Sequence, residues 1–276
     1  MNYYYLISSL PDMSPQMDSS NLDFDDLFDM IRRNLTKKDK KLLRYLIYPN
    51  DINNLLSILC QEYKAFPTAP FKKPSVFNLE DIKAYKLSRK NFPDFMNDFL
   101  AENEDRLANM NPRDMEDAII DRFYNEVFGL DNTFLSNYFT FVRELKSLIA
   151  AFHFNTYDFL SQPNIHDADR LILQVGPDRS PSALVTKDYP YLNALIKVLS
   201  ENKPEKIERF IDTVIWDFLE EKTQGLFGTE DVFAYTIKLQ IIQRWAIIDS
   251  SNGQECFEKL LHKIINDVTS TKTPAI

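Results

Sequence analysis

The chain has 276 residues, of which 41 are acidic and 32 are basic, and its formal net charge is -9. This charge repels phosphate backbones and anionic lipid headgroups at long range, so we expect neither a nucleic-acid partner nor direct lipid binding. Hydrophobic residues make up 44% of the chain and only 5 residues are glycine, a composition typical of a folded protein rich in helices. At roughly 150 residues per domain, the length suggests about two domains, which closely packed helices can merge into a single body over residues 1–276.

The cysteines and the N-terminus bear on where the protein works. Cys60 and Cys256 have neither a CxxC nor a Cys/His spacing, so we interpret them as buried thiols rather than zinc ligands. No Lys or Arg precedes Arg32, so the charged region of a secretory signal peptide is missing. No stretch approaches the ~20 apolar residues that span a bilayer. We therefore expect a soluble, cytoplasmic protein that reaches a membrane only by peripheral attachment to a membrane complex.

Three helices are predicted within residues 1–63, because apolar side chains recur there at spacings of three and four. The three stripes are Phe24, Leu27, Phe28, Ile31 and Leu35, then Leu42, Leu43, Leu46 and Ile47, and finally Ile52, Leu55, Leu56, Leu59 and Tyr63. Pro49 is expected to stop the second helix, and Asn50 or Asp51 is expected to cap the third.

A run of basic residues lies between the first two stripes, at Lys37, Lys38, Lys40, Lys41 and Arg44. It could form a local basic patch, but Thr36 and Asp39 among these residues resemble a helix start. A solvated helix face is the preferred interpretation, because charge runs on helices usually face water.

The middle of the chain combines a loop with two well-marked helices. Pro67, Pro70 and Pro74 lie among polar and aromatic residues, so residues 64–78 are predicted to be a connecting loop. Asn111 before Pro112 predicts the cap and first position of a helix that continues at helical spacing to Gly129. Residues 131–157 contain neither proline nor glycine and carry a continuous apolar stripe, which predicts a long central helix.

The last third begins with a predicted break at residues 163–190, which contain Gly176, Pro177 and Pro181. Three helices are predicted after it, around residues 192–199, 207–219 and 230–248. Thr229 is expected to cap the third of them, and Glu230 and Asp231 suit the positive end of its dipole.

The search for chemistry predicts no catalytic residue, no cofactor site and no metal site. The three histidines lack a partner histidine three or four residues away, and no GxSxG, GxxxxGK[ST] or GxGxxG pattern occurs. His166, Asp167 and Asp169 have ligand-like spacing but follow a proline break, where aspartates commonly cap helices. His153 is interpreted as a packed residue of the long helix. An enzyme whose site assembles from scattered residues such as His153 and His166 stays open as an alternative.

Three helical segments have the same arrangement: polar residues come first, a short aliphatic block follows, and polar or aromatic residues end the segment. They begin at Asp51, Arg143 and Ile237, and their aliphatic blocks lie roughly 95 residues apart, which indicates related lobes. The C-terminal stretch FAYTIKLQIIQRWAIIDSSNGQECFEKLLHKI resembles the C-terminal part of the C/d subunit of rotary V/A-type ATPases. The matching positions are Phe233, Tyr235, Lys238, Ile241, Ile242, Trp245, Ile248, Gly253, Phe257, Leu260 and Ile264.

The opening YYYLISSLPDM is similar to the start of an uncharacterised bacterial family associated with V-type ATPase gene clusters, and this second resemblance covers nearly the whole chain. The acidic and arginine-rich pattern common in C/d helices is replaced here by Leu239, Gln240, Gln243 and Arg244. The resemblance implies an all-α fold of three helical lobes, provisionally residues 1–78, 79–175 and 176–276, that form an open funnel.

The implied function is that of a non-catalytic adaptor between the central stalk and the membrane rotor ring. Its partners would be the rotor-ring and central-stalk subunits, and the isolated protein is expected to be a monomer. The alternative is a helical assembly or regulatory factor of that complex or another one.

Two further expectations concern the N-terminal run at residues 3–7 and the side chain of Trp245. The run at residues 3–7 is the expected exception to helix, because its aromatic and β-branched residues would also suit a short strand or an extended segment. Trp245 lies on an apolar stripe with Ile241, Ile242 and Ile248 and should be buried, so Trp245→Ala should cost about 3 to 5 kcal/mol.

Overall fold

The computed structural model describes residues 2–15, 17, 22–67, 69–89, 91–157, 171–172, 174–177, 180–223, 225 and 227–249. The fold is all-α, with 70% of the chain helical and no strand within these residues. This confirms the predicted fold class. No helix within the described ranges is long and apolar enough to cross a membrane.

The chain divides into two compact units. Unit 1 joins residues 1–34 with residues 226–276, and unit 2 consists of residues 35–225. The division into three related lobes that form a funnel stays a prediction.

Unit 1 brings the N-terminal segment together with the last described helix. It contains α1 (Tyr4–Ser9), α2 (Phe24–Asn34) and α13 (Thr229–Asp249), and α2 contacts α13. The backbone N–H of Tyr3 donates to the Phe227 carbonyl at 2.6 Å, and the rings of Tyr4 and Phe227 meet edge to face with centroids 4.8 Å apart. Tyr235 adds a third link by donating from its hydroxyl to the Pro11 carbonyl at 3.0 Å.

The run at residues 3–7, which suited a short strand or an extended segment as well as a helix, is not an exception to helix. The Ile7 N–H donates to the Tyr3 carbonyl at 3.0 Å, and the chain is helical from Tyr4 to Ser9. Tyr3, Leu6 and Leu10 are buried at spacings of three and four, which only a helical turn places on one face. Burial of that face therefore outweighs the weak strand preference of the aromatic residues.

Helix α13 is buried on several sides. Its buried residues are Val232, Phe233, Ala234, Thr236, Ile237, Leu239, Ile241, Ile242 and Trp245. The predicted burial of Trp245 is confirmed, since 7% of its surface is exposed. Thr229 is the first helical residue rather than a preceding cap, and the Asp231 carboxylate accepts from the Gly228 N–H at 2.8 Å instead.

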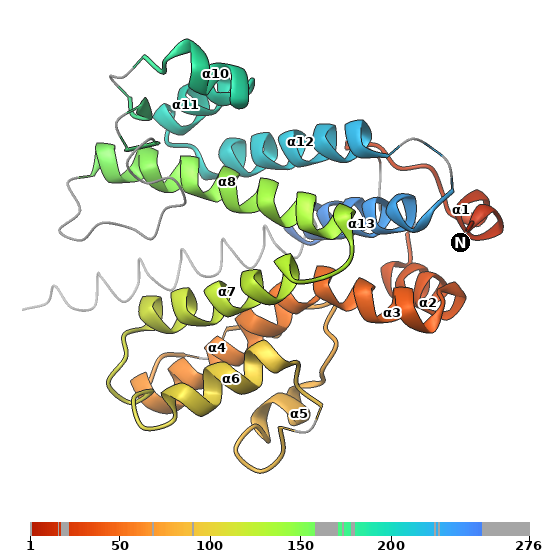
Figure 1. The fold of residues 1–276 in the computed structure, drawn as a ribbon, viewed down its shortest axis with the longest axis vertical. Coiled ribbons are helices and arrows are strands. Elements are labelled where there is room, and N and C mark those ends of the chain that lie inside the picture. Colours follow the sequence, from red (N-terminus) through yellow and green to blue (C-terminus); the bar gives the residue numbers. More distant parts are fainter. Residues whose placement is uncertain are drawn as a thin grey trace, which may run out of the picture. The chain divides into compact units, whose positions relative to one another are not determined.

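The helices of unit 2 are α3 (Lys37–Leu43), the 3-10 helix η1 (Arg44–Leu46), α4 (Tyr48–Lys64), α5 (Leu79–Lys83), α6 (Asp94–Asn103), α7 (Pro112–Phe128), α8 (Thr133–Thr156), α10 (Ala183–Asp188), α11 (Leu192–Ser200) and α12 (Pro204–Lys222). They pack both against neighbours in sequence, such as α6 against α7 and α11 against α12, and against more distant ones, such as α4 against α7 and α8 against α11 (Figure 1). The loop predicted at residues 64–78 is confirmed between α4 and α5.

Local signals located α7 and α8 correctly. The Asn111 side chain accepts from the Asp114 N–H, Pro112 is the first residue of α7, and Gly129 follows its end. Asn132 caps the long helix α8 in the same way by accepting from the Leu135 N–H. Helices α5 and α6 were not predicted.

The predicted effect of Pro49 is wrong. Helix α4 begins at Tyr48, so Pro49 lies in its first turn, where the missing N–H costs nothing because that group has no intrahelical partner. Neither Asn50 nor Asp51 caps the helix; both side chains bind a later loop.

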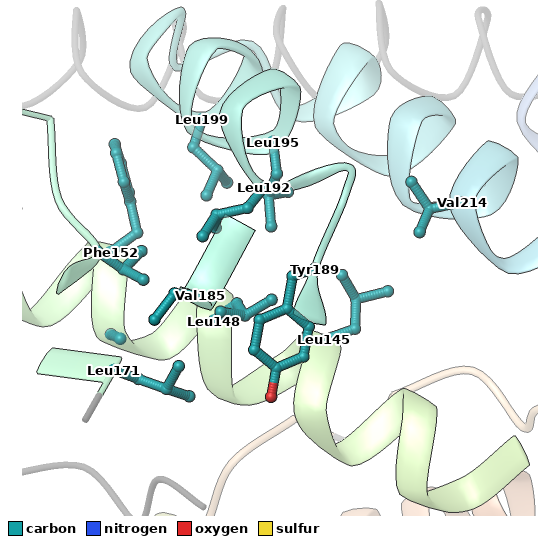
Figure 2. Packing of buried hydrophobic residues seen from close by; sticks show 12 residues of the cluster. Leu145, Leu148, Phe152, Leu171, Val185, Tyr189, Leu192, Leu195, Leu199 and Val214 are labelled. Carbon is teal, nitrogen blue, oxygen red and sulfur yellow. The ribbon is translucent and has the colours of Figure 1, made fainter. Parts of the chain in front are cut away.

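An apolar cluster joins α8, α10, α11 and α12 (Figure 2). Phe152 and Leu148 of α8 approach Val185 of α10 and Leu195 of α11, and all four are nearly inaccessible to solvent. The segment predicted as a break at residues 163–190 therefore contains a helix, α10, whose Val185 adds to this core.

Candidate functional site

Helix α4 carries a polar stripe that consists of Asn50, Asp51, Asn54 and Ser57. These residues lie at helical spacing on the side opposite the apolar residues Ile52, Leu55 and Leu59. Asp51 and Asn54 are buried, with 0% and 4% of their surfaces exposed. Buried polar side chains require hydrogen-bond partners, and the partners come from the loop after α4.

That loop includes a ribbon, residues 69–77, which has no regular secondary structure. Asn54 binds both backbone groups of Lys72: its Oδ1 accepts from the Lys72 N–H at 2.8 Å and its Nδ2 donates to the Lys72 carbonyl at 3.0 Å. One helical turn further on, the Ser57 hydroxyl accepts from the Ala69 N–H at 3.0 Å. One amide side chain therefore replaces the two backbone hydrogen bonds that a neighbouring strand would provide.

Asn50 and Asp51 hold the second half of the ribbon. Asn50 Nδ2 donates to the Pro74 carbonyl at 2.9 Å. The Asp51 carboxylate accepts from the Val76 N–H at 3.0 Å and from the Phe77 N–H at 3.2 Å. The four side chains of the polar stripe thus bind the backbone of the ribbon at both ends and in the middle.

Burial raises the pKa of the Asp51 carboxyl from 3.8 to about 6, although hydrogen bonds from Ser75, Val76 and Phe77 oppose this shift. Ser75 Oγ lies 2.5 Å from Asp51 Oδ1 and 2.6 Å from the Phe77 carbonyl oxygen. A hydroxyl has one hydrogen, so it cannot donate to both acceptors at once. The Ser75 hydroxyl therefore donates either to the Asp51 carboxylate, which opposes the rise in the pKa of Asp51, or to the Phe77 carbonyl.

The side chains at the start of the ribbon and just before it are exposed. We define this exposed edge as Phe66, Pro67, Pro70, Lys72 and Lys73. Phe66 is a large aromatic residue with 51% of its surface exposed. No ion pair to either lysine occurs among the described residues.

A second polar connection in unit 2 centres on Glu126 of α7. Its Oε1 accepts from the Tyr45 hydroxyl at 2.6 Å, and its Oε2 accepts from the Phe95 N–H in the first turn of α6 at 2.9 Å. Burial, followed by the hydrogen bond to Glu126, raises the pKa of Tyr45, so the phenol keeps its proton. Glu126 therefore links η1, α6 and α7.

A shallow polar pocket of about 470 Å³ lies between α6 and α7. Arg122 forms an ion pair with Glu102 within it, and Arg106 is a second cation. The lining residues are Glu102, Asn103, Arg106, Met110, Asp114, Ala118, Asp121, Arg122 and Asn125. The mixture of three carboxylates and two guanidinium groups favours no single ligand charge.

Of the residues considered for chemistry from the sequence, the structure describes His153. His153 lies on α8, where its ring stacks on Tyr157 with centroids 5.7 Å apart, and burial lowers its pKa. His166, Asp167 and Asp169 lie outside the described residues. Within the part of the chain that the structure describes, no group of three or more His, Cys, Asp or Glu side chains could hold a metal ion.

The four lysines of the basic run near residue 40 belong to α3, and Arg44 is the first residue of η1. The Thr36 side chain accepts from the Asp39 N–H at 3.1 Å, which confirms the predicted helix start. Lys37, Lys38, Lys41 and Arg44 are exposed to solvent. The interpretation of this run as a solvated helix face agrees with that exposure.

Sequence reasoning missed the polar stripe and its partner. The signal was available in part, because Asn50, Asn54 and Ser57 recur at spacings of four and three on a helix whose other side is apolar. The segment that these side chains bind could not be predicted from the sequence, because it lies up to 26 positions further along the chain.

Comparison with known proteins identifies a family for the chain. No curated protein and no solved structure matches it. A family profile with the description "Protein of unknown function (DUF2764)" matches residues 1–268. This match confirms the expected membership of an uncharacterised family that covers nearly the whole chain, and the chain therefore belongs to the DUF2764 family.

Proposed function

We propose that this protein is a non-catalytic adaptor that links the central stalk to the membrane rotor ring of a V/A-type rotary ATPase. The observation that carries the proposal is the resemblance of residues 233–264 to the C-terminal part of the C/d subunit. The similarity of the opening YYYLISSLPDM to a family associated with V-type ATPase gene clusters supports the same assignment.

The burial of the matching residues supports the proposal. Phe233, Ile241 and Trp245 lie on α13 and are buried. These three residues of the C/d-like pattern are thus part of a packed helix, as expected if the resemblance reflects a shared helical core.

The polar connections of unit 2 also suit a mechanical part. An adaptor that transmits torque must resist bending, and directional hydrogen bonds to buried groups fix geometry more strictly than apolar contacts do. Asp51 accepts from two backbone N–H groups of the ribbon, and Glu126 accepts from one backbone N–H of α6. These carboxylates have a structural role, which is what an adaptor without chemistry of its own requires.

The test is a pull-down from detergent-solubilised membranes with the tagged full chain at low salt. The expected result is recovery of stalk and ring subunits in fixed stoichiometry. Recovery of no ATPase subunit would contradict the proposal, and substoichiometric recovery only during assembly would favour the assembly-factor alternative. The purified protein should neither hydrolyse ATP nor bind it tightly, and it should not bind bare anionic liposomes, because its net charge of -9 opposes such binding.

A further inference from the structure

The ribbon is attached to the rest of unit 2 mainly by side chains of the polar stripe. Within the part of the chain that the structure describes, its residues form no backbone–backbone hydrogen bond. The described hydrogen bonds that connect it to another element all involve Asn50, Asp51, Asn54 and Ser57 of α4. Its first five residues include four exposed ones, Ala69, Pro70, Lys72 and Lys73, so little apolar contact opposes their departure from α4.

Phe77 fixes the C-terminal end of the ribbon. Only 6% of its surface is exposed, and its ring centroid lies 5.0 Å from that of Phe92 and 6.3 Å from that of Tyr48. The ribbon is thus anchored in the apolar core at one end, whereas residues 69–76, which we call the latch, depend mainly on hydrogen bonds. A segment with few buried apolar contacts can open locally at a lower free energy than whole helices unfold.

Asp51 is the one titratable side chain among the four that hold the latch. Its surface is 0% exposed, and it forms no ion pair among the described residues. A buried carboxylate without a cation is costly in its ionised form and much less so when it carries a proton. Departure of the latch removes Ser75 and Val76, two of its hydrogen-bond partners, and lets water replace them. Ionisation of Asp51 therefore favours the open latch.

The charged groups on the surrounding elements do not alter this conclusion. Helix α4 packs against η1, α5 and α7. Arg44 of η1 lowers the pKa of Tyr48, one turn before Asp51, and Glu126 of α7 raises it. None of the charged side chains of α5 and the latch shifts the pKa of Asp51; they are Glu80, Asp81, Lys83, Lys72 and Lys73. Burial is the main influence on its protonation.

We infer that the latch is a proton-controlled switch: it stays on α4 when Asp51 carries a proton and opens more readily when Asp51 is ionised. Opening uncovers the polar stripe, in which Asp51 and Asn54 are nearly inaccessible while the latch is closed. The surface that α4 presents to solvent thus depends on pH. This inference goes beyond the proposed function and does not depend on it.

Hydrogen exchange of the full chain measures the opening of the latch. The Lys72 N–H, bound by Asn54, and the Val76 N–H, bound by Asp51, report on it. Since burial raises the pKa of Asp51 from 3.8 to about 6, the protection factors of both amides should fall about tenfold between pH 5 and pH 8. The Leu135 N–H is the matched control, because the neutral Asn132 side chain holds it in the same unit, and its protection should not change.

Two substitutions test whether Asp51 is responsible. Asp51→Asn cannot ionise, so the protection of the Lys72 N–H should become independent of pH. Ser75→Ala keeps the carboxylate but removes a hydroxyl that stabilises its ionised form, so the fall in protection should extend to higher pH. The second variant keeps the switch testable if Asp51→Asn does not fold.

The outcomes are distinct. A fall in protection that is confined to the latch and abolished by Asp51→Asn supports the switch. The switch is overturned if the protection of Lys72 and Val76 does not fall with pH, or if Leu135 loses protection equally, since unit 2 would then unfold as a whole. It is also overturned if Asp51→Asn keeps the full pH dependence or if Ser75→Ala leaves its range unchanged.

Discussion

Two parts of unit 2 are held in place by different kinds of contact. The cluster around Phe152 and Leu195 is apolar throughout and joins helices through close packing (Figure 2). The ribbon at residues 69–77 is instead held on α4 by hydrogen bonds from the polar stripe. Apolar packing provides most of the stability but little direction, whereas hydrogen bonds fix the backbone of a segment that has no regular structure.

The largest loss of stability should come from a substitution in the apolar cluster. Phe152 is 2% exposed, and Phe152→Ala should lower the free energy of unfolding by about 3 to 5 kcal/mol because it removes a packed ring and leaves a cavity. Denaturant unfolding of the full chain measures this loss. Leu184→Ala is the control, since Leu184 is 75% exposed and its change should stay within about 0.5 kcal/mol. Equal effects of the two substitutions would contradict the assigned core.

The stability that the ribbon contributes should depend on pH, unlike the stability that the apolar cluster contributes. The folded-state pKa of Asp51 is raised to about 6, so the folded protein keeps a proton that the unfolded chain has already released at lower pH. The contribution of this group to stability is therefore complete below pH 3.8 and is lost as the pH rises through 6.

Asp51→Asn removes this titration while keeping a neutral side chain of similar shape. The unfolding free energy of the variant minus that of the natural protein should rise by about 2 kcal/mol between pH 4 and pH 7, since each pKa unit corresponds to about 1.4 kcal/mol and part of the contribution is already lost at pH 4. Urea unfolding at a series of pH values measures this difference. A difference that does not vary with pH would show that Asp51 titrates normally.

Loss of the two hydrogen bonds from Asn54 to the ribbon should lower the free energy of unfolding by a smaller amount. Asn54→Ala removes both hydrogen bonds to Lys72, whose backbone can then be solvated, so we expect a loss of about 2 kcal/mol. Limited trypsin digestion after Lys72 should also become faster, because the ribbon is released. Asn53→Ala is the matched control: Asn53 is exposed and donates only to Pro49 of its own helix. If both variants resist trypsin equally, Asn54 does not hold the ribbon.

The smallest effect concerns a single hydrogen bond. Tyr45→Phe removes the donor to Glu126 but keeps the ring, so the free energy of unfolding should fall by about 1 kcal/mol. Tyr5→Phe, at a residue that is 89% exposed, should produce no measurable change in thermal unfolding. A loss of more than about 3 kcal/mol for Tyr45→Phe would place Glu126 among the main determinants of stability.

Much of the fold could be predicted where the signal is local. Asn111, Pro112 and Gly129 marked the ends of α7, and the apolar stripe of residues 131–157 marked α8, because caps and helical periodicity act within one or two turns. Local rules failed at Pro49, which is compatible with either the end of one helix or the first turn of the next. Only the packing of Tyr48 and Ile52 into the core distinguishes these cases.

The helical class, most helix positions, the exposure of the lysines on α3 and the burial of Trp245 follow from the amino-acid sequence alone. Which distant segments meet depends on tertiary packing: Tyr3 meets Phe227 in unit 1, and the polar stripe meets the ribbon in unit 2. The two kinds of interaction differ in how far apart the partners lie along the chain. Helix periodicity and capping involve neighbours within a few residues, whereas the partner of a buried Asp51 or Asn54 depends on how a whole loop folds back.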